Sequence, residues 1–309
     1  MNLPYAFTVA GEHCLVRLVN PKRIDWSFGF FDQGRPQKRP DNAIESFHDW
    51  RANVRLPSQF DSTACIFHVS RCGSTLLAQN LKSSGQAIVL SEPTFMRILR
   101  TNLDGRITSE EAVDGIARAI AQWQEWAVSQ GKRLVIKFNS QAHQWRDEIF
   151  AALPGAHFLF LHREPAAVLE SIARKPPQYL QREAAQHRFA ARSEIDRLQE
   201  DPLLKAAALR YWGALDAFQE APSSCLVVAY RELKSRFAEI SEHFRLGHGT
   251  WDATRNAKAG DPSLGERYKP VADANVARII EQHSDLHGML DDRYRQFVDR
   301  QQAKVSPTR

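Results

Sequence analysis

Cysteine is scarce in this sequence, and its spacing excludes an architecture held together by disulfides. The 309 residues include four cysteines, none of them in a Cys-x-x-Cys pair. This number and spacing predict free thiols. Cys65 and Cys225 lie in apolar runs, so we expect them to be buried structural thiols.

Long apolar segments and a strong charge of either sign are also missing. No stretch approaches the roughly 18 consecutive apolar residues of a membrane span, and the first residues lack a basic start followed by a long apolar segment. Lys and Arg number 41 against 36 Asp and Glu, and this excess of +5 does not by itself indicate nucleic acid as a partner. We therefore expect a soluble cytoplasmic protein with no membrane span and no nucleic-acid partner.

Short apolar runs alternate with longer amphipathic segments along the chain. Five runs are continuously apolar, as strands buried on both faces are, and they cover residues 64–69, 87–90, 133–138, 157–162 and 225–230. Between the second and third runs, a capping box of Thr108 and Glu111 opens a helical pattern that ends at Gly131. Repetition of strand, helix and strand predicts an α/β fold with a central parallel sheet of about five strands and helices on both faces.

Small polar residues gather directly after the first apolar run, in SRCGSTLL (residues 70–77). Free backbone N–H groups and the helix dipole make this strand-to-helix position an anion site. Gly73 permits close approach of the backbone, Ser74 and Thr75 add hydroxyl donors, and Arg71 carries a guanidinium suited to phosphate or sulfate oxygens. The structural alternative is a strand-to-helix turn that binds nothing.

The loop departs from the Walker A motif of nucleoside triphosphatases. That motif places a lysine after its second glycine, whereas here the basic residue precedes the only glycine. A Mg-nucleotide enzyme also needs an acidic ligand at a strand end, where the third and fourth runs offer basic residues in KFNS and LHREP. We therefore expect an anion bound without a metal. His283 and His287 are interpreted as a solvated helix face rather than a metal site.

A second group of polar residues follows the fourth run, in LHREPAAVLESI. Pro165 suits the first position of a helix. Ser171 follows Arg163 by eight residues, or about two helical turns. Together the arginine and the serine would hold a second phosphate, unless both are structural.

At these motifs the sequence resembles the nucleotide-dependent sulfotransferases, which use 3′-phosphoadenosine 5′-phosphosulfate (PAPS). SRCGSTLL resembles the family's 5′-phosphosulfate loop, LFLHREPAAVLESI resembles its 3′-phosphate motif, and LVVAYREL resembles its strand-tyrosine segment. The resemblance covers residues 64–247 and implies a three-layer P-loop-like fold with PAPS as co-substrate and no metal. It implies the following donor-binding residues: Arg71, Cys72, Gly73, Ser74, Thr75, Arg163, Ser171 and, near the adenine, Tyr230.

We expect a single sulfotransferase-like domain over residues 1–309. The first 60 residues differ in pattern from the rest, and we expect them to form a covering segment of strands and loops. Residues 61–250 would form the nucleotide-binding core, and residues 251–309 a C-terminal loop and helices. Residues 174–200 are polar and basic, typical of either a mobile lid or a solvated helical face.

Two positions depart from the family pattern. Cys72 stands where a serine is common, which a loop that binds through backbone N–H groups tolerates. The catalytic histidine that follows the third strand's lysine in one branch is missing, because Lys137 is followed by Phe138 and Asn139. A C-terminal glycine-basic segment has only a loose counterpart in residues 263–270, where Arg267 or Lys269 would reach the 3′-phosphate.

Glu92, directly after the second run, is the candidate general base. Other branches of the family are similar in using a glutamate near this point. A structural role is the alternative, as a carboxylate at a helix start before Pro93, and His143 is the second candidate base. Arg71 and Lys137 would neutralise the oxygen that leaves with the nucleotide.

The motifs together predict a sulfotransferase that acts on a hydroxyl of a small molecule or glycan. The alternatives are a kinase-like P-loop nucleotide enzyme and a non-catalytic nucleotide-binding protein. The acceptor cannot be deduced from any motif, and a homodimer is one possible oligomeric state.

Overall fold

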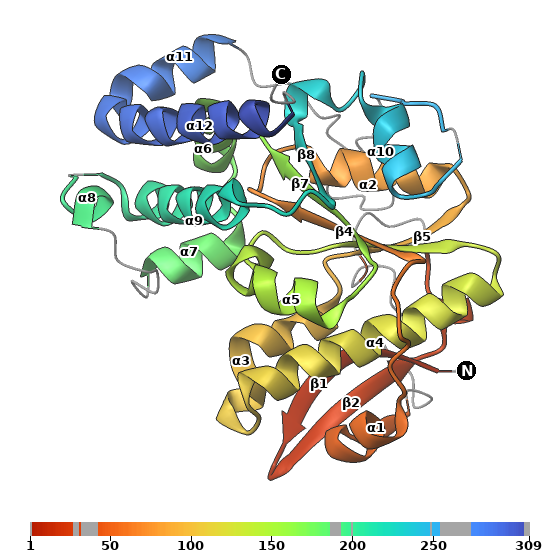
Figure 1. The fold of residues 1–309 in the computed structure, drawn as a ribbon. Helices are drawn as coiled ribbons and strands as arrows, with labels where there is room; N and C mark the ends of the chain where they lie inside the picture. Colours follow the sequence, from red (N-terminus) through yellow and green to blue (C-terminus); the bar gives the residue numbers. More distant parts are fainter. Residues whose placement is uncertain are drawn as a thin grey trace.

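A five-stranded parallel sheet lies at the centre of the protein (Figure 1). The computed structural model describes residues 2–26, 31, 43–185, 193–198, 200–247, 249–253 and 273–305. The strands, in spatial order, are β5 (Ala87–Ser91), β6 (Arg133–Lys137), β4 (Thr63–His68), β7 (His157–His162) and β8 (Cys225–Ala229). All neighbours pair in parallel, which confirms the predicted α/β class and the five apolar runs.

The order of the strands determines where a ligand site belongs. The chain passes from β4 to β5 and β6 on one side of the sheet and then crosses β4 to reach β7 and β8 on the other side. In open parallel sheets, ligands bind at the carboxyl ends of the strands near such a reversal of order. The residues that follow β4, β5, β6 and β7 therefore share one edge of the sheet.

Helices cover both faces of this sheet, with α2 packed on β5 and β6 from one face and α4 packed on β6 from the other (Figure 1). Between residues 74 and 243 the described helices are α2 (Ser74–Ser83), α3 (Ile98–Gly105), α4 (Ser109–Ser129), α5 (Arg146–Ala152), α6 (Pro165–Arg174), α7 (Gln178–Ala185), α8 (Ser193–Asp196), α9 (Pro202–Gln219) and α10 (Phe237–His243). Short 3-10 turns are η1 (Pro21–Arg23), η2 (Thr94–Arg97), η3 (Ala142–Trp145) and η4 (Tyr230–Glu232). The predicted capping box of Thr108 and Glu111 opens α4.

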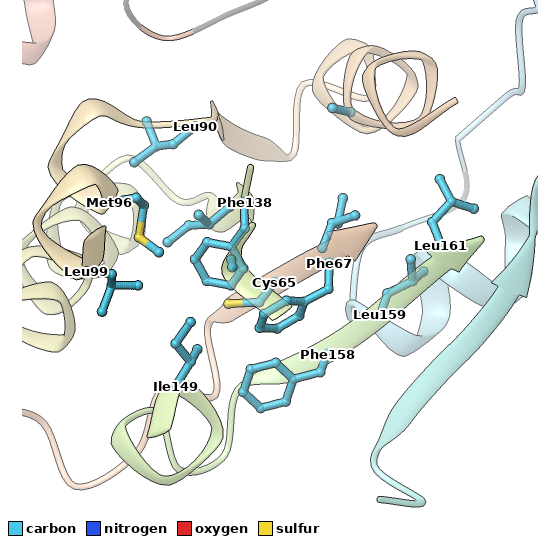
Figure 2. Packing of buried hydrophobic residues seen from close by; sticks show 14 of the residues in the cluster. Cys65, Phe67, Leu90, Met96, Leu99, Phe138, Ile149, Phe158, Leu159 and Leu161 are labelled. Carbon is cyan, nitrogen blue, oxygen red and sulfur yellow. The ribbon is translucent and has the colours of Figure 1, made fainter. Parts of the chain in front are cut away.

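Aromatic side chains fill the core on one face of β4. Figure 2 shows Phe67 beside Phe138 and Phe158, with Ile149 of α5 closing the cluster. The ring centroid of Phe67 lies 4.8 Å from that of Phe138 and 6.3 Å from that of Phe158. Each strand of the central sheet is apolar because helices cover it on both sides. All four cysteines are free and buried, as predicted for Cys65 and Cys225.

The N-terminal residues form a second, antiparallel sheet of β1 (Leu3–Ala10), β2 (His13–Val19) and β3 (Ile44–Ser46). Helix α4 lies between this sheet and the central one (Figure 1), and Trp123 of α4 donates its indole N–H to the Pro4 carbonyl at 2.7 Å. The prediction of strands and loops alone was wrong at α1 (Phe47–Asn53). Ser46 caps this helix, and Phe47 and Trp50 are buried on one face of it.

The chain continues after α6 as an amphipathic layer rather than a fully solvated face. Leu180 of α7 and Ile195 of α8 are buried, and α7 packs against α9. The C-terminal helices α11 (Asp273–Gln282) and α12 (Ser284–Val305) pack on α6, and α12 also packs on α9. His283, which precedes α12, contacts a Glu200 oxygen through Nδ1 at 2.6 Å. In the described ranges, no helix has the length and apolar character needed to cross a membrane.

Buried histidines make the stability of the fold depend on pH. Burial lowers the pKa values of His143 and His162 to about 4. An unfolded histidine titrates near about 6.5, so the unfolded chain binds more protons than the folded one between that pH and 4. The free energy of unfolding should therefore fall on acidification through this window, by up to about 1.4 kcal/mol per pH unit for each group.

We expect His162→Gln to make the free energy of unfolding depend less steeply on pH between about pH 6.5 and 4, by the contribution of about one proton. Urea unfolding at several pH values measures this dependence. The matched control is His13→Gln, because His13 is exposed at the start of β2. An equal pH dependence of the unfolding free energy in the wild type and His162→Gln would show that His162 does not contribute to it.

Candidate active site

The loop between β4 and α2 turns through left-handed backbone and leaves the start of α2 open. Ser70, Arg71 and Gly73 have φ angles of 72°, 51° and 80°. Gly73 is the N-cap of α2, and among the described residues no side chain caps the helix there. An uncapped first turn at the carboxyl edge of the sheet is a position that suits an anion.

His68 fixes the base of this loop. Its Nε2 lies 2.9 Å from the Phe138 carbonyl after β6, and its Nδ1 accepts from the Ser70 N–H at 3.0 Å. Burial, assisted by the charge of Lys137, keeps the pKa of His68 well below its usual range, so the ring is neutral. Because Nδ1 accepts a hydrogen bond, Nε2 carries the proton and donates a hydrogen bond to the Phe138 carbonyl. Sequence reasoning assigned no role to this residue, because a histidine at a strand end carries no motif.

The three motif segments meet at Gly73. A Cβ added at Gly73 would lie 2.6 Å from two ring carbons of Tyr230, so only glycine fits beneath this ring. The guanidinium carbon of Arg163 lies 4.4 Å from the Tyr230 ring centroid, and Arg163 donates to the Arg71 carbonyl at 3.1 Å. Residues that are up to 159 positions apart, Arg71 and Tyr230, thus surround one loop.

Arg163 is 8% exposed at the carboxyl end of β7. Tyr211 of α9 donates to its carbonyl at 2.7 Å and holds the backbone. The Nε groups of Arg163 and Arg71 are both buried without a hydrogen-bond acceptor in the described part of the chain. Buried guanidinium donors without an acceptor are the donor set that a phosphate or sulfate group satisfies.

The other donor-binding candidates lie on α2 and α6. Ser74 is buried in the first turn of α2, and Thr75 follows it. Burial raises the pKa of Cys72 to about 11, which makes this residue a neutral packing thiol. Pro165 is the first residue of α6, as predicted, and Ser171 lies two turns along it. Among the described residues, the Ser171 hydroxyl makes no hydrogen bond to Arg163.

Glu92 and Lys137 form a salt bridge at the ends of the neighbouring strands β5 and β6. Lys137 is 1% exposed, whereas the Glu92 side chain is 35% exposed. Glu92 has a φ of 53°, and its N–H donates to the Lys137 carbonyl at 2.7 Å. The left-handed backbone turns Glu92 toward β6, a strained conformation of the kind that recurs at functional sites.

The two halves of the site interact electrostatically. Burial lowers the pKa of Arg71, while the negative charge of Glu92 acts in the opposite direction. Lys137 and Arg163 both favour the ionised form of Cys72 against the larger effect of burial. The salt bridge therefore belongs to the same electrostatic environment as the loop.

His143, the second candidate base, is buried. Its Nδ1 lies 2.7 Å from the Ser140 carbonyl, and its Nε2 lies 3.2 Å from where a Cβ at Gly213 of α9 would stand. Burial lowers the pKa of His143 to about 4, and the ring, which belongs to η3, packs against α9.

Two of the sequence candidates, Arg267 and Lys269, lie outside the described residues. Within the described ranges, no group of three or more His, Cys, Asp or Glu side chains is arranged to hold a metal ion.

Comparisons with known proteins give distant similarities. No family model and no curated protein matches the sequence. Among solved structures, the chain is similar to a sulfotransferase domain from the curacin biosynthetic pathway, with 13% identity over 74% of this chain and 98% of that one and a TM-score of 0.36. It is also similar to a sulfotransferase from Alicyclobacillus acidocaldarius, with 14% identity over 73% of this chain and 94% of that one and a TM-score of 0.35.

A third similar structure is retinol dehydratase in a complex with retinol and PAP, with 12% identity over 100% of this chain and 99% of that one and a TM-score of 0.37. At such low identities and TM-scores, these similarities assign no activity. The function proposed below rests on the residues of the site.

Gly73→Ala tests the close packing of the loop beneath Tyr230. A left-handed alanine costs about 1–2 kcal/mol at either position, so Gly131→Ala is the matched control, since Gly131 has a φ of 67° and open space around it. We expect Gly73→Ala to reduce the free energy of unfolding more than the control does, because the new Cβ also displaces the Tyr230 ring. Equal losses in the two variants, measured by chemical denaturation, would show that the ring yields freely.

Proposed function

We propose that this protein is a sulfotransferase that moves a sulfuryl group from PAPS to a hydroxyl of a small-molecule or glycan acceptor. One observation carries the proposal: Gly73 of the first motif, Arg163 of the second and Tyr230 of the third lie in contact at the N-terminus of α2. PAPS carries a phosphosulfate at its 5′ end and a phosphate at its 3′ position. The loop before α2 and Arg163 offer hydrogen-bond donors for these two anionic groups.

The two anionic ends of the donor would bind to different residues. The N–H groups of residues 71–75 and the Arg71 guanidinium would hold the 5′-phosphosulfate. Arg163 and Ser171 would hold the 3′-phosphate, with Tyr230 beside the adenine as the family resemblance implies. The buried Nε groups of Arg71 and Arg163 support this placement, because both would gain an acceptor.

The transfer is an in-line displacement with balanced charges. The acceptor oxygen forms a bond to sulfur while the bond between sulfur and the 5′-phosphate oxygen breaks, and the acceptor proton passes to a base. Negative charge grows on the leaving oxygen, where Arg71, Lys137 and the N-terminus of α2 would stabilise it. The products are a sulfate ester and 3′,5′-adenosine bisphosphate.

We assign the role of base to Glu92. Its salt bridge with Lys137 supports this role, because the contact holds the carboxyl group at the edge of the sheet where the motif loops gather. Its partial exposure makes it reachable by an acceptor hydroxyl, whereas Lys137 is almost fully buried. When the Glu92 carboxylate takes the proton, it becomes neutral and no longer offsets the charge of Lys137. The Lys137 ammonium would then stabilise the negative charge on the leaving oxygen.

Nucleotide preference tests the donor. We expect 3′,5′-adenosine bisphosphate to raise the melting temperature without Mg²⁺, and more than AMP, ADP or ATP do. A ligand at 100 times its dissociation constant stabilises the folded state by about 2.7 kcal/mol. Arg163→Ala should abolish the selective shift. A shift with Mg-ATP alone would favour the kinase-like alternative.

Glu92→Gln tests the base. The amide keeps the shape of the side chain but accepts no proton, so we expect bisphosphate binding to persist while sulfation of an acceptor panel falls by about 10²- to 10⁴-fold. Glu164→Gln, at a half-exposed carboxylate just after β7, is the matched control. Unchanged turnover in Glu92→Gln would remove Glu92 from the reaction.

A further inference from the structure

A tyrosine outside the motifs joins the two halves of the site. Tyr179 lies on α7, and its hydroxyl lies 3.1 Å from the Ser140 hydroxyl and 3.4 Å from the Ser70 hydroxyl. Ser70 immediately precedes Arg71 in the loop after β4, and Ser140 follows Lys137 by three residues at the end of β6. One hydroxyl therefore bridges the loop that carries Arg71 and the strand end that carries Lys137.

The Tyr179 ring is held in place from α9. The guanidinium carbon of Arg210 lies 5.2 Å from the ring centroid, within the range of a cation–π contact. Leu180, the next residue, is 1% exposed, which anchors α7 to the core. The hydroxyl thus has a fixed position on a packed helix.

The segment between α6 and α7 also contacts the Arg71 side chain. Arg71 donates to the carbonyl of Lys175, which directly follows α6. Burial lowers the pKa of the Arg71 guanidinium, and a coulombic interaction with Tyr179 acts in the opposite direction. The segment from Lys175 to Tyr179 therefore contacts both the side chain of Arg71 and the hydroxyl of its neighbour Ser70.

We propose that Tyr179 is a positioning residue for sulfuryl transfer: its hydroxyl links Ser70 to Ser140 and so aligns Arg71 with Lys137 on the leaving oxygen. This inference rests on the proposed function. Tyr179 touches neither the reacting atoms nor the nucleotide in this role. Its effect belongs to the transfer step, because the misplacement of a charged group by about 1 Å costs on the order of 10²-fold in rate.

The experiment compares Tyr179→Phe with the wild type. Phenylalanine keeps the ring and its contact with Arg210 but removes the hydroxyl. Tyr294→Phe is the matched control, because the buried Tyr294 hydroxyl of α12 has no hydrogen-bond partner in the described ranges. Ser140→Ala and the double variant Tyr179→Phe/Ser140→Ala complete a double-mutant cycle.

Three measurements are made on each full-length protein. The first is the dissociation constant of 3′,5′-adenosine bisphosphate. The second is single-turnover release of sulfate from PAPS with water as acceptor, in which PAPS and water give the bisphosphate, sulfate and two protons, so that no acceptor needs to be known. The third is amide hydrogen exchange of residues 70–73 in the bisphosphate complex.

For Tyr179→Phe we expect bisphosphate affinity within about twofold of the wild type, sulfate release slower by on the order of tenfold or more, and faster exchange of the loop. Ser140→Ala should reproduce these effects, and the double variant should be no worse than either single variant. Tyr294→Phe should match the wild type in all three measurements.

The outcomes separate this inference from the proposed function. Unchanged exchange of residues 70–73 in Tyr179→Phe would overturn the bridge, whether or not the protein turns over PAPS. Faster exchange with unchanged sulfate release would overturn the positioning role. A wild type that neither binds the bisphosphate nor releases sulfate would instead overturn the proposed function, and with it the transfer role of Tyr179.

Discussion

The contact between the Tyr230 ring and Gly73 is the constraint on which the site depends. The ring occupies the space that any larger side chain at Gly73 would need. It also provides the aromatic face beneath Arg163, which in turn holds the carbonyl of Arg71. The left-handed loop, the buried guanidinium and the open start of α2 are therefore one packed unit, and a displacement of the ring would disturb all three.

Three cationic side chains lie largely out of solvent at this site. Lys137 is almost fully buried and forms a salt bridge with Glu92, and the removal of a partner from a buried charge is strongly destabilising. Arg163 and Arg71 keep donors without acceptors, which native structures generally avoid. A site for a doubly anionic ligand gives these features a common explanation, because such a ligand supplies the missing acceptors.

The polar residues around the site are held by groups that carry no motif. His68 joins the loop to the end of β6 through two hydrogen bonds, and Tyr211 of α9 fixes the carbonyl of Arg163. Histidine and tyrosine at such places are common in protein cores, so only the contacts that they make distinguish them. His143 illustrates the converse, since it was a candidate base from its place after the third strand, and its side chain is buried against α9.

The sequence by itself determined the five strands, the capping box of α4 and the strand-to-helix loop of residues 70–75, because continuous apolar runs, helix caps and glycine-hydroxyl turns are local patterns with local physical causes. It missed α1, whose single turn of buried aromatics is too short for a periodic pattern. The tertiary structure alone decided that the Tyr230 ring packs on Gly73, that Glu92 meets Lys137, and that Tyr179 bridges Ser70 and Ser140. These contacts depend on strand order, on left-handed backbone at Glu92 and Arg71, and on the packing of α7 against α9. Such long-range geometry arises only when segments distant in the chain fold against one another.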